Sequence, residues 1–186
     1  MGSLLAKVYA SVLNSRLSLW AEGRGVRASG QAGFRKDHRT TDQAFVLRAL
    51  VEQVRAAHTR LYVCFVDFRR AYDGVPRDLL WGKLRAVGVA PPFLRAMQAL
   101  YADVPMCVRF PHGLSEPFSS TIGVKQGCPL SPTLFGMYID DLQAVVEAGA
   151  EAFDLAQLHG AAVCMYAAKA GGMYVCILQY CVCRSR

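Results

Sequence analysis

Asp67 is the residue whose type and position most clearly suggest chemistry. It lies in the apolar run 61–68, which is rich in aromatic and β-branched residues and predicts a buried strand. A carboxylate at the end of a buried strand costs free energy unless a partner compensates its charge. Asp67 therefore has two interpretations. It is either a carboxylate that lies at the solvent edge of the strand or caps the next turn, or a ligand for Mg²⁺, which needs oxygen ligands in octahedral geometry.

Tyr72 and Asp73 follow Asp67 closely and precede Pro76. The fixed φ of proline suits the first turn of a helix, so Pro76 predicts a helix start at this point. A carboxylate just before a helix can cap its unpaired backbone N–H groups. We therefore predict that Asp73 is the N-cap of this helix.

Three segments resemble blocks of the reverse transcriptases of non-LTR (LINE-type) retrotransposons. Residues 29–53 (SGQAGFRKDHRTTDQAFVLRALVEQ) resemble the fingers block, and residues 65–84 (FVDFRRAYDGVPRDLLWGKL) resemble the first catalytic block. Residues 123–142 (GVKQGCPLSPTLFGMYIDDL) resemble the Gln-Gly block. The blocks stand in the family's order and spacing, and the resemblance covers roughly residues 4–160.

This resemblance implies part of a right-hand polymerase, with fingers and palm over residues 1–160 and no thumb. A divergent, apolar and Cys-rich tail is expected over residues 161–186. The implied chemistry is two-metal nucleotidyl transfer with Mg²⁺ as cofactor. The implied partners are an RNA template, a DNA primer and dNTP.

The resemblance also implies roles for individual residues. Asp67 would be the first metal ligand, and Tyr72 would lie under the sugar of the incoming nucleotide and exclude a 2′-hydroxyl. Gln126 and Gly127 would border nucleotide and template, since a residue without a side chain permits close approach.

Positive charge is concentrated in the N-terminal third of the chain. The net charge is +7, and residues 1–70 hold 12 Lys and Arg against 5 Asp and Glu. For any single one of these charges, a solvated helical surface is the favoured interpretation. The clustering nevertheless makes this third the favoured region for contact with a phosphate backbone. Within this region the resemblance assigns Arg35, with Lys36 as a helper, to the triphosphate, because a guanidinium binds phosphate in a bidentate manner.

The second catalytic block of the family, a hairpin carrying Tyr-Ala-Asp-Asp, is expected near residues 165–173. Tyr166 and Ala167 match it, but Ala168 and Lys169 stand where the two aspartates belong. Metal ligands are lost there, and an ammonium group would repel Mg²⁺. We predict a member of an enzyme family that is inactive alone. The alternatives are a non-catalytic nucleic-acid-binding remnant and an unselected product of a decayed element.

Two further motifs receive structural interpretations. Residues 138–141 (YIDD) lie within a helix predicted from Pro132 to about Ala148. Adjacent carboxylates on a helix point about 100° apart and do not converge on one metal pair, so we predict that they are surface residues. Cys128 has no His or Asp partner nearby in the sequence, which favours an inert packing thiol over a nucleophile.

Helices interleaved with a few strands predict an α+β domain. In the first helix, the predicted buried stripe consists of Leu4, Leu5, Val8, Val12, Leu13 and Leu17. The predicted helices cover residues 4–20, 42 to about 54, 76–84, 91–100 and 132 to about 148, and the predicted strands cover residues 61–68, 106–110 and 118–122.

Composition excludes a disordered chain, since 53% of the 186 residues are hydrophobic. The seven Cys include no CxxC motif, and the first residues show no signal peptide, which favours a reducing compartment. We expect an intracellular protein of the nucleus or cytoplasm that is not secreted. Residues 161–183 are apolar, but Lys169, Gln179 and two glycines argue against a membrane span. A change of reading frame near residue 162 would also explain this tail.

Overall fold

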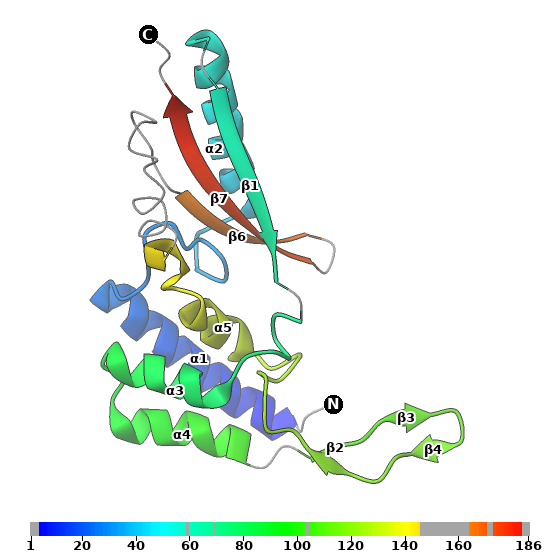
Figure 1. Ribbon diagram of the computed structural model, residues 1–186. Helices are drawn as coiled ribbons and strands as arrows, with labels where there is room; N and C mark the ends of the chain where they lie inside the picture. The colour runs from blue at the N-terminus through cyan, green and yellow to red at the C-terminus, as the bar shows by residue number, and fades with distance from the viewer. Residues whose placement is uncertain are drawn as a thin grey trace. The chain divides into compact units, whose positions relative to one another are not determined.

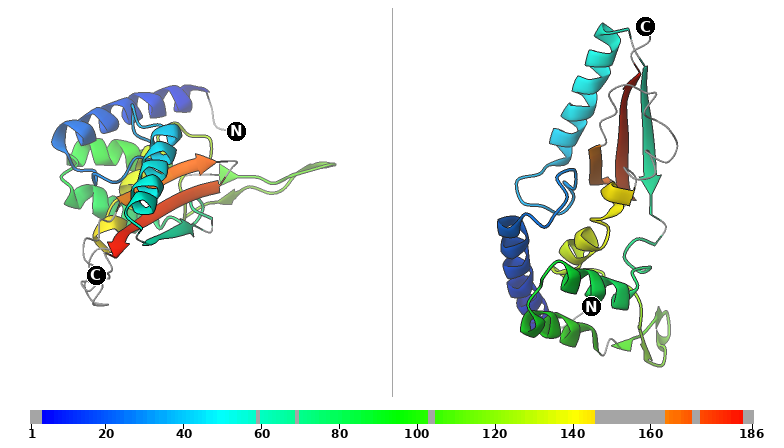
Figure 2. Two further views of the ribbon diagram at one scale, coloured as in Figure 1. Left: turned by 90° about the horizontal axis from the view of Figure 1, so that it is seen from above. Right: turned by 60° about the vertical axis from the view of Figure 1, so that its left-hand side comes forward.

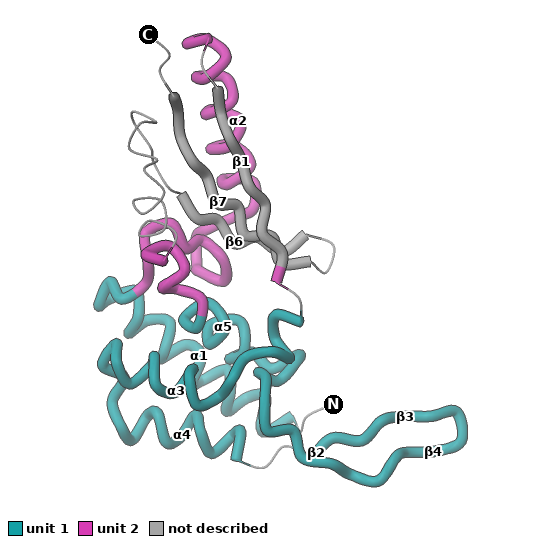
Figure 3. The backbone as a smooth tube through the Cα atoms, in the orientation of Figure 1, with its two compact units in different colours: residues 1–26, 70–138 teal, residues 27–69, 139–186 magenta. Residues whose placement is uncertain are grey.

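The computed structural model describes most of the chain, in six ranges. These are residues 4–58, 60–68, 70–102, 105–145, 164–170 and 173–183. The chain forms two compact units, each built from two separate segments (Figure 3). Unit 1 comprises Met1–Val26 and Arg70–Tyr138, and unit 2 comprises Arg27–Arg69 and Ile139–Arg186. The boundary predicted at residue 160 lies outside the described residues.

Unit 1 is a cluster of four helices (Figure 1). They are α1 (Leu4–Arg24), α3 (Arg77–Ala86), α4 (Pro91–Ala102) and α5 (Ser131–Tyr138). Helix α3 packs against both α4 and α5, and α1 also packs against α5. The core is mainly aliphatic, because α1, α3 and α4 each turn one apolar face inward and α5 is buried over most of its length. Its most deeply buried side chains include Leu17, Leu80, Leu84, Met97, Leu130 and Leu134.

Helix α1 buries a different stripe from the one predicted. Its buried residues Ala10, Leu13, Leu17 and Ala21 are spaced by three, four and four positions, which is one face of a helix. Two of them are alanines, which are less apolar than the leucines and valines that determined the prediction. Four residues of the predicted stripe are exposed instead, namely Leu4, Leu5, Val8 and Val12.

An antiparallel β-arm connects α4 to the loop before α5. Strand β2 (Pro105–Met106) pairs with β5 (Phe118–Ser119), and β3 (Arg109–Phe110) pairs with β4 (Gly113–Leu114). All four strands are exposed, and the arm extends away from the helices of unit 1 (Figures 1 and 2). The predicted pairing of residues 106–110 with residues 118–122 is confirmed only for Met106 and Phe118, because residues 109–110 pair with residues 113–114 instead and residues 120–122 form no strand.

Unit 2 contains a three-stranded antiparallel sheet of order β1-β7-β6. Its strands are β1 (Arg60–Asp67), β6 (Cys164–Ala170) and β7 (Met173–Cys183), and helix α2 (Thr40–Ala56) contacts β1 and β6. The helix begins at Thr40, two residues before the start predicted near Asp42. Asp42 still serves the helix start, because its carboxylate accepts a hydrogen bond of 3.0 Å from the backbone N–H of Arg39.

The described residues combine helices with a few strands, as the predicted α+β class requires. Helices α3 and α4 and strand β1 lie within a few residues of their predicted ranges. Among the described residues, no helix combines the length and the apolar character that crossing a bilayer would require.

Candidate nucleotide-binding site

Two predicted nucleotide-binding segments lie side by side in unit 1. These are the turn after β1 that contains Tyr72 and the loop of the Gln-Gly block. The backbone N–H of Val124 donates to the carbonyl of Tyr72 at 2.8 Å, and the N–H of Gly123 donates to the carbonyl of Val75 at 2.8 Å. Both lengths are typical of well-formed hydrogen bonds. These two backbone hydrogen bonds therefore hold together residues that lie some fifty positions apart in the sequence.

Gly123 makes this contact possible. Its φ is +85°, a left-handed conformation that residues with a Cβ rarely adopt. A Cβ at this position would lie 2.9 Å from both the Cα and the carbonyl oxygen of Asp73, and 3.0 Å from the carbonyl oxygen of Tyr72. All three atoms belong to the backbone and cannot move aside cheaply. Gly123 was not among the predicted site residues, because nothing in the local sequence distinguishes it from the other loop glycines.

Gln126 and Asp73 form the side-chain bridge between the same two segments. The amide Nε2 of Gln126 donates to both carboxylate oxygens of Asp73, at 2.9 and 3.2 Å. The prediction that Asp73 caps helix α3 is therefore wrong. The N-cap residue is Pro76, which makes no side-chain cap bond, and the Asp73 carboxylate is engaged by Gln126 instead. A bond to a charged acceptor is stronger than one between neutral groups, so it orients the Gln126 amide.

Tyr72 has an aromatic partner in the adjacent helix. Its ring meets that of Phe135 on α5 edge-on, with centroids 5.3 Å apart and planes at 65°. This is a favourable geometry for two aromatic rings. Phe135 is buried, whereas Tyr72 is only half-buried. The packing fixes the ring of Tyr72 while leaving part of it accessible to a ligand.

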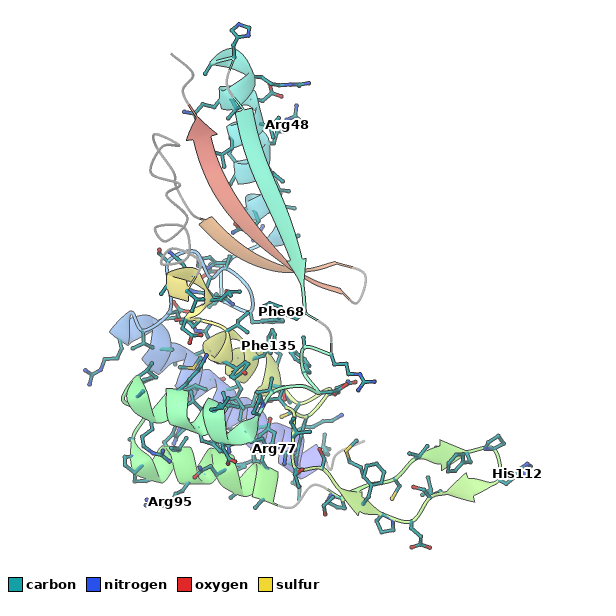
Figure 4. The ribbon with its side chains drawn as sticks, viewed as in Figure 1. Arg48, Phe68, Arg77, Arg95, His112 and Phe135 are labelled. Atoms are coloured by element: carbon teal, nitrogen blue, oxygen red, sulfur yellow. The ribbon has the colours of Figure 1, made fainter. Side chains whose placement is uncertain are left out.

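Arg77 holds the loop that precedes Gly123. From the first turn of α3, its guanidinium donates to the carbonyls of Ser120 at 2.6 Å, Gly123 at 2.9 Å and Tyr101 at 3.2 Å (Figure 4). Burial lowers the pKa of Arg77, and the nearby Tyr101 opposes that shift. The planar fork of arginine suits several carbonyls at once. Arg77 was not predicted from the sequence either, because its acceptors lie 24–46 positions away.

A cavity of about 190 Å³ lies beside the Gln-Gly loop. Leu100 of α4 and residues 125–128 line it, together with Ala6, Lys7 and Ala10 of α1. Gln126 and Gly127, both predicted to border nucleotide and template, therefore face an open space. Cys128 is a half-buried free thiol in the same wall.

In unit 2, Arg35 is held by the loop to which it belongs. Its Nη1 donates to the carbonyl of Ala28 at 3.2 Å and to that of Gln31 at 3.1 Å. Arg35 is half-buried and Lys36 is exposed. The two predicted triphosphate ligands thus differ: Arg35 is oriented by backbone carbonyls, whereas the side chain of Lys36 is open to solvent.

Asp67 also belongs to unit 2, where it ends strand β1. In the sheet it pairs with Val175 of β7, and Val175 pairs on its other side with Ala168 of β6. Lys169 follows, paired with Tyr174. Strands β6 and β7 thus form a hairpin over the residues where the second catalytic block was expected, with Ala168 in the same row of the sheet as Asp67. Among the described residues, no three His, Cys, Asp or Glu side chains gather to hold a metal ion.

The YIDD string differs from its predicted form. Helix α5 ends at Tyr138, so the prediction of one continuous helix from Pro132 is wrong: the helix is interrupted at residues 139–141, and helical structure resumes at residues 142–145. The predicted end near Ala148 lies among residues 146–163, outside the described residues. Asp141 is exposed as predicted, but Asp140 is half-buried and is not a simple surface residue. Both oxygens of Asp140 accept from the backbone N–H of Ala28, at 3.0 and 2.9 Å. Burial raises the pKa of Asp140, whereas the Ala28 N–H, Arg27 and Arg35 lower it.

Comparison with known proteins agrees with the motifs. The chain belongs to the reverse transcriptase (RNA-dependent DNA polymerase) family, whose sequence model matches residues 2–167. The match extends seven residues past the boundary predicted at residue 160 and ends directly before Ala168.

The relatives come from transposons. The chain is 28% identical over 141 residues to the "Probable RNA-directed DNA polymerase from transposon X-element" of Drosophila melanogaster, covering 74% of this chain and 15% of that protein. It is 29% identical over 112 residues to the Pol polyprotein of the Drosophila element R2DM, covering 60% and 11%. It is 31% identical over 99 residues to a 149 kDa protein of transposon TX1 of Xenopus laevis, covering 53% and 8%. The predicted resemblance to non-LTR retrotransposon reverse transcriptases is confirmed, and the chain spans about a tenth of the length of these relatives.

Proposed function

We propose that this chain is part of a non-LTR reverse transcriptase domain that keeps the surfaces for nucleotide and template but does not catalyse nucleotidyl transfer alone. The observation that carries the proposal is the pair Ala168 and Lys169 at the end of the hairpin beside Asp67. The hairpin is present, yet neither residue offers a carboxylate. In this proposal the chain is a fingers and palm portion that works inside the cell, in the nucleus or cytoplasm.

Nucleotide binding is supported by the locked arrangement of Tyr72 and Gln126. Phe135 fixes the ring of Tyr72, so this ring can support the sugar of an incoming dNTP and leave no room for a 2′-hydroxyl. Asp73 orients the amide of Gln126 at the edge of the same surface. Gly127, next to it, leaves space for close approach of nucleotide and template. Each residue has a position set by its neighbours, which is what a binding surface requires.

The triphosphate is assigned to Arg35 and Lys36. Carbonyl contacts orient the guanidinium of Arg35, and the exposed ammonium of Lys36 adds a second positive charge. A guanidinium and an ammonium together neutralise part of the triphosphate charge. The RNA template and DNA primer complete the expected set of partners.

The metal expected from the family does not fit the residues present. Two Mg²⁺ ions need several carboxylate ligands, and Asp67 alone supplies one where Ala168 and Lys169 supply none. This mismatch is the physical reason for the proposed inactivity.

Primer extension tests the proposal. The unaltered chain, with an annealed RNA template and DNA primer, Mg²⁺ and dNTPs, is expected to give no product. The double substitution Ala168→Asp and Lys169→Asp is expected to give extension that disappears when Asp67→Ala is added. Extension by the unaltered chain, lost in its Asp67→Ala variant, would overturn the proposal.

A second candidate is nucleic-acid binding without chemistry, favoured by the 12 Lys and Arg of residues 1–70. Fluorescence anisotropy of labelled RNA is expected to show affinity that falls as salt rises. Two exposed arginines on helices provide a test and a control: Arg48 on α2 lies within residues 1–70, and Arg95 on α4 lies outside them (Figure 4). Arg48→Ala is expected to reduce the salt slope by about one, and Arg95→Ala to leave it unchanged. Absence of binding at low salt would exclude this function.

A further inference from the structure

We propose that Asp140 is a positioning residue that holds the loop segment 28–31 and, through it, the guanidinium of Arg35. The proposal rests on the proposed function, because it assigns Asp140 to the triphosphate site. Asp140 belongs to the string YIDD, where it was expected to be a surface residue. It lies in unit 2, with the loop it contacts.

Asp140 makes the main contact to this loop. Its two carboxylate oxygens accept from the N–H of Ala28 at 3.0 and 2.9 Å. Three residues later, Oε1 of Gln143 accepts from the N–H of Gly30 at 3.3 Å. A hydrogen bond between a carboxylate and a backbone N–H is charge-assisted and stronger than a neutral one. The segment after α5 therefore holds the loop through two contacts, and the contact from Asp140 is the stronger one.

The contact passes to Arg35 through a single residue. Ala28 presents its N–H to Asp140 and its carbonyl to Nη1 of Arg35, at 3.2 Å. The carbonyl of Gln31 is the second acceptor of the same nitrogen, at 3.1 Å. If Ala28 moves, both the amide contact and one guanidinium contact change together. The orientation of Arg35 is thus coupled to Asp140 over two hydrogen bonds.

The surroundings suit this role. Arg27 of the same loop is buried, at 7% exposure, and its Nη1 reaches the carbonyl of Phe34 at 3.5 Å. Asp140 brings a carboxylate to a loop with two arginines, Arg27 and Arg35. Burial raises the pKa of Asp140, and the two guanidinium groups offset part of that shift. Attraction between opposite charges at a half-buried site is stronger than at an open surface. The carboxylate is therefore well placed to keep the loop in one arrangement.

A double-mutant cycle separates positioning from general stabilisation. The probe is inorganic triphosphate, its affinity measured by calorimetry on the full chain. Asp140→Ala is expected to weaken binding about tenfold, and Asp140→Asn, which keeps one acceptor oxygen, to weaken it less. In an Arg35→Ala background, Asp140→Ala is expected to have no further effect, because coupled residues are not additive. Asp141→Asn, at the exposed neighbouring residue, is the matched control and is expected to stay within twofold of the unaltered chain.

Two further readouts complete the test. RNA affinity is expected to stay within twofold in Asp140→Ala, whereas general loss of folding would lower both affinities. Amide hydrogen exchange at Ala28 is expected to rise at least tenfold in Asp140→Ala and to stay unchanged in Asp141→Asn. The inference would be overturned if Asp140→Ala weakened triphosphate binding equally in the unaltered and the Arg35→Ala backgrounds. Unchanged amide exchange at Ala28 in Asp140→Ala would also overturn it. If the unaltered chain binds no triphosphate, the proposed nucleotide site fails, and exchange at Ala28 still decides whether Asp140 holds the loop.

Discussion

Gly123→Ala is the substitution with the most sharply defined structural consequence. The added Cβ would lie 2.9 Å from the backbone of Asp73 and 3.0 Å from that of Tyr72. Real Cβ atoms do not tolerate such distances to backbone atoms, so the two segments must separate. Alanine at a φ of +85° adds strain of its own.

The expected cost follows from these two effects. The left-handed conformation costs about 1–2 kcal/mol for a residue with a Cβ. Separation puts at risk the two backbone hydrogen bonds donated by Gly123 and Val124, each worth about 0.5–1.5 kcal/mol. The free energy of unfolding of unit 1 is therefore expected to fall by about 2–5 kcal/mol in Gly123→Ala.

Urea denaturation followed by tryptophan fluorescence measures this change. Both tryptophans, Trp20 and Trp81, lie in unit 1, so their emission reports on the unit that holds Gly123. Gly88→Ala is the matched control, because Gly88 has a φ of +91° but an added Cβ there would meet no atom within 4 Å beyond its own chain neighbours. It is expected to cost about 1–2 kcal/mol. If Gly123→Ala cost no more than Gly88→Ala, close backbone contact would not be what holds the two segments together.

Three further predictions concern Arg77, Tyr101 and Asp140. Arg77→Lys is expected to lower the free energy of unfolding by about 1.5–3 kcal/mol in the same assay, because an ammonium group cannot replace a guanidinium that reaches several carbonyls. Its control is Arg95→Lys at an exposed position, which is expected to change the free energy of unfolding by less than about 0.5 kcal/mol. Tyr101→Phe removes a buried hydroxyl 3.1 Å from Oγ of Ser131 and is expected to cost about 0.5–1.5 kcal/mol, and an unchanged urea midpoint would contradict this. Burial raises the pKa of Asp140 above its ordinary value of 3.8, so the carboxyl group binds its proton more tightly in the folded chain than in the unfolded chain. The stability that this protonation contributes is complete below pH 3.8 and is lost as the pH rises from 3.8 through the raised pKa. In Asp140→Asn, the free energy of unfolding is expected to lose this pH dependence when it is measured across mildly acidic pH. Parallel pH profiles for Asp140→Asn and the unaltered chain would refute the prediction.

Local patterns predicted much of the fold. The apolar run ending at Asp67 is strand β1, and Pro76 and Pro91 stand at the starts of α3 and α4. These signals act over a few residues, where proline geometry and side-chain periodicity decide the conformation. The family was predicted for a related reason, because its motifs are short and keep their order.

The features that could not be predicted from the sequence depend on distant partners. Asp73 has the position of a helix cap, yet its partner is Gln126, 53 residues away. Asp140 has the position of a helix surface residue, yet it binds Ala28, 112 residues away. Local propensity cannot predict such pairs, because tertiary contacts override it and no periodic pattern marks them. The candidate site was thus predicted residue by residue, but the contacts that hold it were not.

The division of each unit into two chain segments also governs how the protein can be assembled. During synthesis, unit 1 cannot be complete until Tyr138 has emerged, because its first segment ends at Val26 and its second begins only at Arg70. Strand β1 must wait longer still for its neighbour β7, which begins at Met173. Pairing over such separations is entropically costly and slow. A fragment ending at residue 138 would contain all of unit 1 but would leave β1 without its sheet partners and α2 without its contact to β6.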